Sequence, residues 1–159
     1  MHIFQYHRIF EVYLKTTPMQ KLIITCILFL TSIFLAHAQE KASFVITVNI
    51  SGMKADKGDV YVALYNSEAS FLKDGFKGTI VKVSNKNATA IFKNIEKGTY
   101  AISVFHDKND NKKMDTNFMG IPKEPTGCSN GATGFMGPPK YKNAKFELTE
   151  DIVIPVQVK

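Results

Sequence analysis

Apolar and polar residues alternate along much of the chain after residue 42. From Phe44 to Ser51 every second residue is apolar, and the face they share consists of Phe44, Ile46, Val48 and Ile50. This pattern is typical of a strand with one buried face. Six further segments rich in apolar, β-branched or aromatic residues also predict strands: residues 58–65, 79–84, 88–93, 99–106, 144–148 and 152–158.

Turn residues separate the predicted strands. Asn85-Lys86-Asn87 stands between residues 79–84 and 88–93, which predicts a hairpin. A further turn is expected over residues 94–98. Pro155 lacks a backbone donor, so the last strand should lie at a sheet edge or carry a bulge. About seven short strands without a convincing helix predict an all-β fold, an antiparallel β-sandwich.

The predicted strand 99–106 leads into a long segment, His106–Tyr141, without a clear strand or helix pattern. This segment holds five of the ten glycines and four of the six prolines. Loops this long are usually functional or disordered. Its aromatic residues and paired Asp and Asn residues favour an ordered loop. We therefore expect one long ordered loop to be the functional or stabilising feature of the domain.

The N-terminal residues have the design of an export signal. Lys21 precedes an uncharged, mostly apolar run, Leu22–Leu35, and the small-x-small sequence Ala36-His37-Ala38 follows directly. The pattern predicts a secretory signal peptide cleaved after Ala38, because the apolar run is short for a transmembrane anchor. Residues 1–18 fit no signal design, so Met19 is the expected start. Residues 1–38 are thus an extension plus signal peptide, and residues 39–159 a single secreted or periplasmic domain without a transmembrane segment.

The charge of residues 39–159 does not indicate nucleic-acid binding. They contain 17 lysines, no arginine and 13 acidic residues, for a net charge of +4. The lysines are scattered singly, which is typical of a solvated surface rather than a nucleic-acid groove. Cys26 leaves with the signal peptide, so Cys128 has no disulfide partner. Without a neighbouring basic residue to activate it, this thiol is expected to be a small buried side chain.

The first part of the loop has a calcium-type spacing of oxygen ligands. The pattern D-x-N-x-N-x-x-x-D resembles the front half of an EF-hand loop, and Ca²⁺ prefers six to eight oxygens. The candidate ligands are Asp107, Asn109, Asn111 and Asp115. However, Lys112 stands where glycine normally makes the turn, and Phe118 where glutamate closes the shell, so Glu124 or Asp59 would have to close it. Alternatively, these Asp and Asn side chains are turn formers that bond their own backbone.

No enzyme motif is found. His106 is the single histidine after cleavage, and its neighbour Asp107 should point to the opposite face of the strand. Ser129 lacks a nucleophile-elbow sequence, and zinc-binding and phosphate-binding motifs are absent from the sequence. We therefore predict a protein that is not an enzyme. A metal enzyme using His106, Asp107 and Glu124 is the least favoured hypothesis.

The rest of the loop is rich in apolar residues. Either they cover the end of the sandwich as a lid, the simpler interpretation, or they display a platform for a ligand. In the second case the candidate ligand-binding residues are Phe118, Phe135 and Tyr141. The partner would be a small ligand, a glycan or an envelope protein.

Several motifs together resemble a bacterial family, domain of unknown function 2141. They are Gly58–Tyr65, the run Gly98–Asn111, Met114–Phe118, Gly120–Glu124, Gly127, Ser129-Asn130, Phe135-x-Gly137-x-Pro139 and Ala144-x-Phe146. The family pattern has glycines at the positions of Asp110 and Lys112 and tends to have an aromatic residue at that of Cys128. Residues 92–100 also resemble a strand-turn-strand device of transthyretin-like modules.

The resemblance implies an exported β-sandwich of the transthyretin-like or immunoglobulin-like kind, and it implies no activity. The chain is therefore expected to be a non-enzymatic binding or structural module of the cell envelope, with a candidate calcium-type loop. The alternative is a carrier of small ligands or glycans that uses the aromatic residues of the loop.

Overall fold

The computed structural model describes residues 17–23, 25–27, 43–135 and 137–159. The chain divides into two units, residues 1–41 and residues 42–159. In the first unit, residues 18–23 and 25–27 are helical. None of the helices formed by the described residues has the length and apolar character needed to cross a bilayer. The predicted cleavage site after Ala38 lies outside the described residues.

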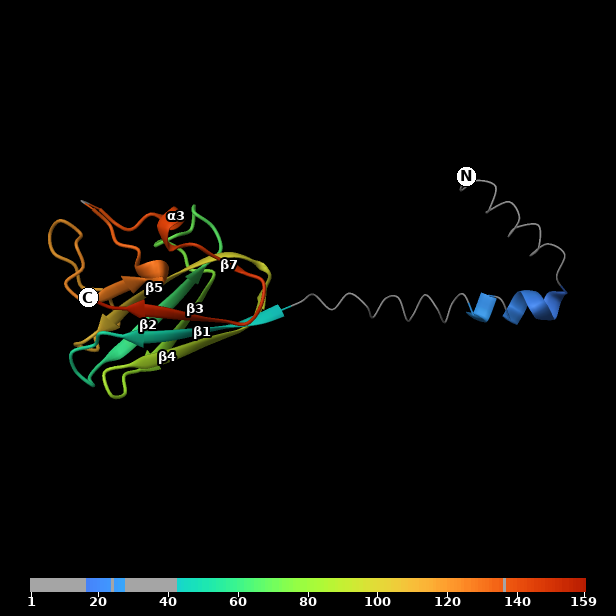
Figure 1. The fold of residues 1–159 in the computed structure, drawn as a ribbon, viewed down its shortest axis with the longest axis horizontal. Helices are drawn as coiled ribbons and strands as arrows, with labels where there is room; N and C mark the ends of the chain where they lie inside the picture. Colours follow the sequence, from blue (N-terminus) through green and yellow to red (C-terminus); the bar gives the residue numbers. More distant parts are fainter. Residues whose placement is uncertain (1–16, 24, 28–42, 136) are drawn as a thin grey trace. The chain divides into compact units, whose positions relative to one another are not determined.

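The second unit is an all-β sandwich, which confirms the predicted fold class (Figure 1). Its smaller sheet has the strand order β4-β1-β8 and consists of β1 (Ser43–Ser51), β4 (Ala88–Glu96) and β8 (Ile152–Gln157). The larger sheet has the order β3-β2-β5-β6 and consists of β2 (Asp59–Tyr65), β3 (Lys77–Lys82), β5 (Gly98–Asp107) and β6 (Thr126–Cys128). The short strand β7 (Phe146–Leu148) pairs with the beginning of β5.

One pair of strands departs from the antiparallel prediction. β8 runs parallel to β1, with Asn49 opposite Pro155, whereas the other strand pairs are antiparallel. β8 lies at the edge of its sheet. The edge position predicted from Pro155 is therefore confirmed, since a proline there removes no hydrogen bond from the interior of the sheet.

The predicted hairpin between β3 and β4 is wrong in its pairing but right in its turn. Ser84 and Asn87 exchange two backbone hydrogen bonds, and Asn85 and Lys86 between them have positive φ values of 51° and 58°. These values are typical of a two-residue type I′ turn. Beyond the turn, however, β3 pairs with β2 and β4 pairs with β1, so the strands join different sheets.

The turn predicted over residues 94–98 is shorter than expected. β4 continues to Glu96 and β5 begins at Gly98. The pairing of β1 with β4 shifts register between Phe44 and Ile46, and Asn94 has a positive φ of 56°. Asparagine tolerates this backbone conformation, so the first residues of the predicted turn form a bulge within β4, and the turn itself is confined to the junction of β4 and β5.

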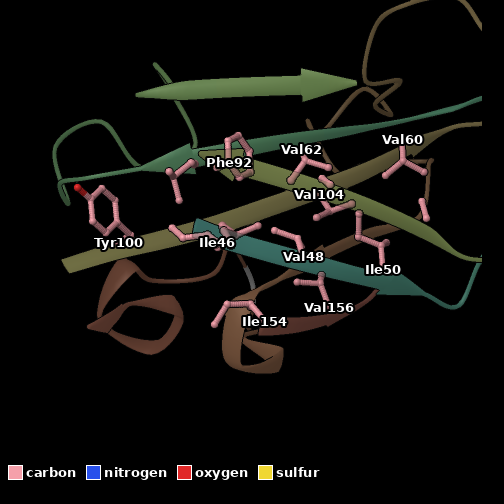
Figure 2. Packing of buried hydrophobic residues seen from close by; sticks show 14 of the residues in the cluster. Ile46, Val48, Ile50, Val60, Val62, Phe92, Tyr100, Val104, Ile154 and Val156 are labelled. Carbon is pink, nitrogen blue, oxygen red and sulfur yellow. The ribbon is translucent and has the colours of Figure 1, made fainter. Parts of the chain in front are cut away.

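The apolar faces of the two sheets meet in one core (Figure 2). Figure 2 shows Ile46, Val48 and Ile50 of β1 directed toward side chains of the facing sheet. These three residues are at most 1% exposed. The alternation read from the sequence therefore places β1 correctly.

A second, smaller core covers the outer face of the larger sheet. Its buried members are Tyr65, Phe71, Ala101, Cys128 and Ala144. Ala144 belongs to a four-residue helix, α3 (Tyr141–Ala144), which the sequence pattern did not predict. This core ties the end of the long loop to the sheet.

Candidate functional site

The long loop runs from the end of β5 to the start of α3, residues 108–140. It contains β6 and a 3-10 helix, η1 (Ser129–Gly131). We distinguish two parts. The base consists of residues 107–115 together with Glu124, and the tip consists of residues 117–122.

Asp107 is the anchor of the base. It is the last residue of β5, and it is fully buried. The Asn111 N–H donates to its Oδ1 at 3.3 Å, and the Lys112 N–H donates to its Oδ2 at 2.7 Å. Hydrogen bonds to a carboxylate are strong, so this side chain fixes the first turn of the loop.

The two asparagines and Asp115 complete a ring of hydrogen bonds. The side-chain amides of Asn109 and Asn111 both donate to the Asp115 carboxylate, at 2.8–3.2 Å. The side-chain Oδ1 of Asn109 accepts from the Asn111 backbone N–H, and the side-chain Oδ1 of Asn111 accepts from the Lys113 backbone N–H. All four candidate calcium ligands thus lie together, and each takes part in the hydrogen bonds that hold the base.

Glu124 closes the base from the other end. It is 7% exposed, and its two oxygens accept from the backbone N–H groups of Lys108 at 3.1 Å and Asp115 at 3.2 Å. The sequence suggested Glu124 or Asp59 as the residue that closes this region. Asp59 instead lies 2.6 Å from the Lys82 ammonium, so Glu124 is the residue that bridges the loop.

The tip is a tight turn that carries apolar side chains. Asn117 organises it: its Oδ1 accepts from the N–H groups of Met119 and Ile121, and its carbonyl oxygen accepts from that of Gly120. Gly120 has a positive φ of 76°, which suits this turn. The Asn117 N–H donates back to the Ile121 carbonyl. The backbone is therefore bonded inward while Phe118, 97% exposed, faces solvent.

After β6 the loop returns to the sheet through η1, where two residues hold it whose role the sequence did not reveal. Ser129 is fully buried; its Oγ accepts from the Ile102 N–H and donates to the Ala144 carbonyl at 2.6 Å. Asn130, with φ 58°, donates from its amide to the Lys145 carbonyl at 2.8 Å. Ser129 links the loop to β5 and α3, whereas Asn130 links it to the end of α3 and the residue that follows. The presence of Ser129-Asn130 among the motifs of the family resemblance was the available signal.

A family model matches most of the sandwich domain and includes the whole of the long loop. Residues 48–154 match the model of a bacterial family described as "Uncharacterized protein conserved in bacteria (DUF2141)". The chain belongs to this family. Neither the curated proteins nor the solved structures gave a significant match to the chain.

The resemblance to this family implies glycines at the positions of Asp110 and Lys112, and the backbone of the base offers a physical reason for them. Both residues have positive φ values, 57° and 65°. Glycine adopts this conformation without the steric cost of a side chain. This member keeps the left-handed turns without the glycines.

The hydrogen bonds of the base favour the interpretation as turn formers. Among the described residues, no group of three or more His, Cys, Asp and Glu side chains is arranged to hold a metal ion. Calcium binding by Asp107, Asn109, Asn111 and Asp115 stays a prediction. A cation would have to share oxygens that already accept from N–H groups.

The three candidate ligand-binding aromatics do not form one platform. Phe118 and Phe135 are 97% and 93% exposed. Tyr141 packs edge-on against Phe71 at 5.6 Å between ring centroids, and its hydroxyl donates to the Thr99 carbonyl. Tyr141 is thus part of the second core. For Phe118 and Phe135 the exposure contradicts a lid.

His106 and Cys128 both point into packed regions of this DUF2141 chain. His106 is fully buried, and its Nε2–H donates to the Lys57 carbonyl at 2.7 Å. Cys128 is 6% exposed, and burial raises the pKa of its thiol to about 11. The expected burial of Cys128 is confirmed, and a thiol with this pKa is a poor nucleophile near neutral pH.

Proposed function

We propose that this chain is an exported, non-enzymatic binding module of the cell envelope, and that the tip of the long loop is its binding surface. Export is inferred from the signal-like sequence that ends at Ala38. The burial of His106 against a backbone carbonyl supports a role without catalysis.

One observation carries the proposal: an ordered turn exposes a cluster of apolar side chains. Phe118, Met119 and Ile121 are 97%, 68% and 53% exposed. Scattered surface apolar residues are ordinary, but three in one five-residue turn lie close together, and clusters of exposed apolar side chains mark interaction sites. The base holds this patch in place through Asp107 and Glu124, as a binding loop on a rigid scaffold requires.

The test is co-sedimentation of the purified, exported protein with the cell-envelope fraction of a bacterium that carries it. We expect the unaltered protein to sediment, and Phe118→Ser and Ile121→Ser to lower the bound fraction at least about fivefold, a loss of about 1 kcal/mol. The matched control is Ile91→Ser on β4, because Ile91 is 52% exposed and Ile121 53%.

Binding that is equal in all four proteins, or absent in all of them, would overturn the tip as the binding surface. Mass spectrometry of the chain expressed in that bacterium tests export: a chain beginning at Gln39 is expected, and retention of residues 19–38 would contradict it.

A further inference from the structure

We infer that the surface bound by the tip is an anionic lipid bilayer. This inference rests on the binding function proposed above and names its partner. The tip would enter the boundary between lipid headgroups and acyl chains, while lysines beside it contact the headgroups.

The first support is the composition and exposure of the tip. The four exposed residues Phe118, Met119, Ile121 and Pro122 carry no side-chain hydrogen-bonding group. A glycan or a polar peptide would require partners for its own polar groups, and these four side chains provide none. The hydrocarbon boundary of a bilayer requires none, and it accepts Phe, Met and Ile side chains favourably.

The second support is the backbone of the tip. The N–H groups of Asn117, Met119, Gly120 and Ile121 all donate within the turn. Backbone groups without partners are costly in lipid, because no water replaces them. The side chain of Asn117, directed into the turn, removes this cost for two of the four N–H groups. The tip can therefore leave water without leaving these donors unpaired.

The third support is the placement of charge. Lys112, Lys113 and Lys123 are exposed at the foot of the tip. Lys123 donates its backbone N–H to the Asp115 carbonyl, which places it beside the base. Between residues 111 and 123 the three lysines stand against one carboxylate, Asp115, for a net charge of +2. Long lysine side chains beside an apolar insertion reach the headgroup level, and an anionic surface attracts each of them.

The acidic residues of the loop do not cancel this arrangement. Asp107 and Glu124 are buried in the base, and Asp115 accepts from two asparagine amides. Asp110 is the exposed exception. Three of the four carboxylates thus bond within the loop, while Asp110, the lysines and the apolar side chains are exposed. In Figure 1 the tip, in orange, projects from the strands of the sandwich.

The test uses the purified exported protein and vesicles of phosphatidylethanolamine with about one quarter phosphatidylglycerol. We expect sedimentation with these vesicles and little with vesicles that lack the anionic lipid. Binding should weaken steeply as NaCl rises from about 50 to 500 mM. Phe118→Ser should lower the partition coefficient at least about fivefold, whereas Ile91→Ser should leave it unchanged.

A charge-matched pair of variants tests the lysines. Replacing Lys112, Lys113 and Lys123 with Gln should weaken binding about fivefold per lysine. Replacing the exposed Lys73, Lys93 and Lys97 with Gln makes the same change in net charge away from the tip, and should have a much smaller effect. Equal losses in the two triple variants would mean non-specific attraction and would overturn the inference.

The outcomes separate this inference from the proposed function. Phe118-dependent binding to envelope fragments without binding to vesicles would overturn the lipid partner and leave the binding module intact, with a protein or glycan as its partner. Absence of binding to both would overturn both. Thermal melts of each variant confirm that the loss of binding is not a loss of fold.

Discussion

The base and the tip of the long loop belong to one continuous segment, yet the base buries carboxylates while the tip exposes apolar side chains. In the base, Asp107 is fully buried and Glu124 is 7% exposed, while in the tip Phe118 is 97% exposed. A domain normally buries its apolar residues, and it buries carboxylates only where they are bonded. The base follows this rule, because four backbone N–H groups donate to its two buried carboxylates. The tip does not follow it, because its apolar side chains are exposed.

The difference separates two tasks within one loop. The carboxylates of the base stabilise the turn, so they are expected to matter for unfolding. The tip contributes little to the folded state, because its side chains remain in water in the unbound protein. Its apolar character therefore points to a partner.

Removing the anchor of the base should have the largest effect. Asp107→Ala leaves the N–H groups of Asn111 and Lys112 without their acceptor, and we expect the free energy of unfolding to fall by about 2–3 kcal/mol. The melting temperature should then fall by roughly 10 °C. Asp110→Asn, at an exposed position of the same turn, is the control and should change little. Equal melts for the two variants would contradict the anchoring role.

The burial of Cys128, where the loop returns to the sheet, can be tested through the pH dependence of stability. Burial raises the pKa of Cys128 from 9.0 to about 11, so the folded state keeps its proton where the unfolded chain loses it. The associated stability is present below pH 9 and is lost as the pH rises toward 11, by up to about 2 kcal/mol. Urea unfolding at several pH values should therefore show a steeper alkaline loss for the unaltered protein than for Cys128→Ala.

Burial also raises the pKa of Tyr65, and because Tyr65 is present in both proteins this effect of burial cancels in the difference. The Cys128 thiolate raises the pKa of Tyr65 further, and that effect is lost together with the thiol in Cys128→Ala. Parallel curves for the two proteins would mean that the Cys128 thiol ionises equally in the folded and unfolded chains.

A glycine in place of Lys112 should stabilise the base slightly. Lys112 has a φ of 65°, so Lys112→Gly relieves backbone strain and should raise the free energy of unfolding by about 0.5–1 kcal/mol. Lys113→Gly makes the same charge change at the neighbouring residue, which does not have a positive φ. It should lower the free energy of unfolding by a similar amount. Denaturant titrations would show opposite signs; the same sign for both would refute the strain argument.

The smallest effect on stability is expected at the tip. Phe118→Ser should change the free energy of unfolding by no more than about 0.5 kcal/mol, because its ring has almost no contacts to lose. The same substitution should give the largest loss of envelope binding. A drop in melting temperature comparable to that of Asp107→Ala would show that the ring packs against the domain.

Periodic segments made most of the fold predictable. Alternation in β1 and the apolar run of β5 reflect burial on one or both faces, which leaves a direct trace in the sequence. Pro155 marked the edge strand for a similar local reason. The pairing of β3 and β4 was not predictable, because the Asn-rich turn is the same whether its strands stay together or separate into two sheets.

The candidate site was predictable in part. The Asp and Asn spacing located the base, but it suits both a cation and a hydrogen-bonded turn, and the spacing alone does not show where each N–H points. The partner of Asp115 across the loop, Glu124, is nine residues away and depends on how the chain folds back. Phe118 and Tyr141 looked alike in the sequence, and only the second core, through Phe71, distinguishes the packed, partly buried ring from the exposed one.

Tryptophan fluorescence tests directly whether the tip contacts the envelope. The chain contains no tryptophan, so Phe118→Trp creates a single fluorescent reporter at the tip, and Ile91→Trp creates an equally isolated control on β4. On addition of envelope membranes, we expect the emission of the tip reporter to shift to the blue as it leaves water, and that of the control to stay unchanged. If the tip reporter keeps the emission of a water-exposed indole, contact between the tip and the envelope is contradicted.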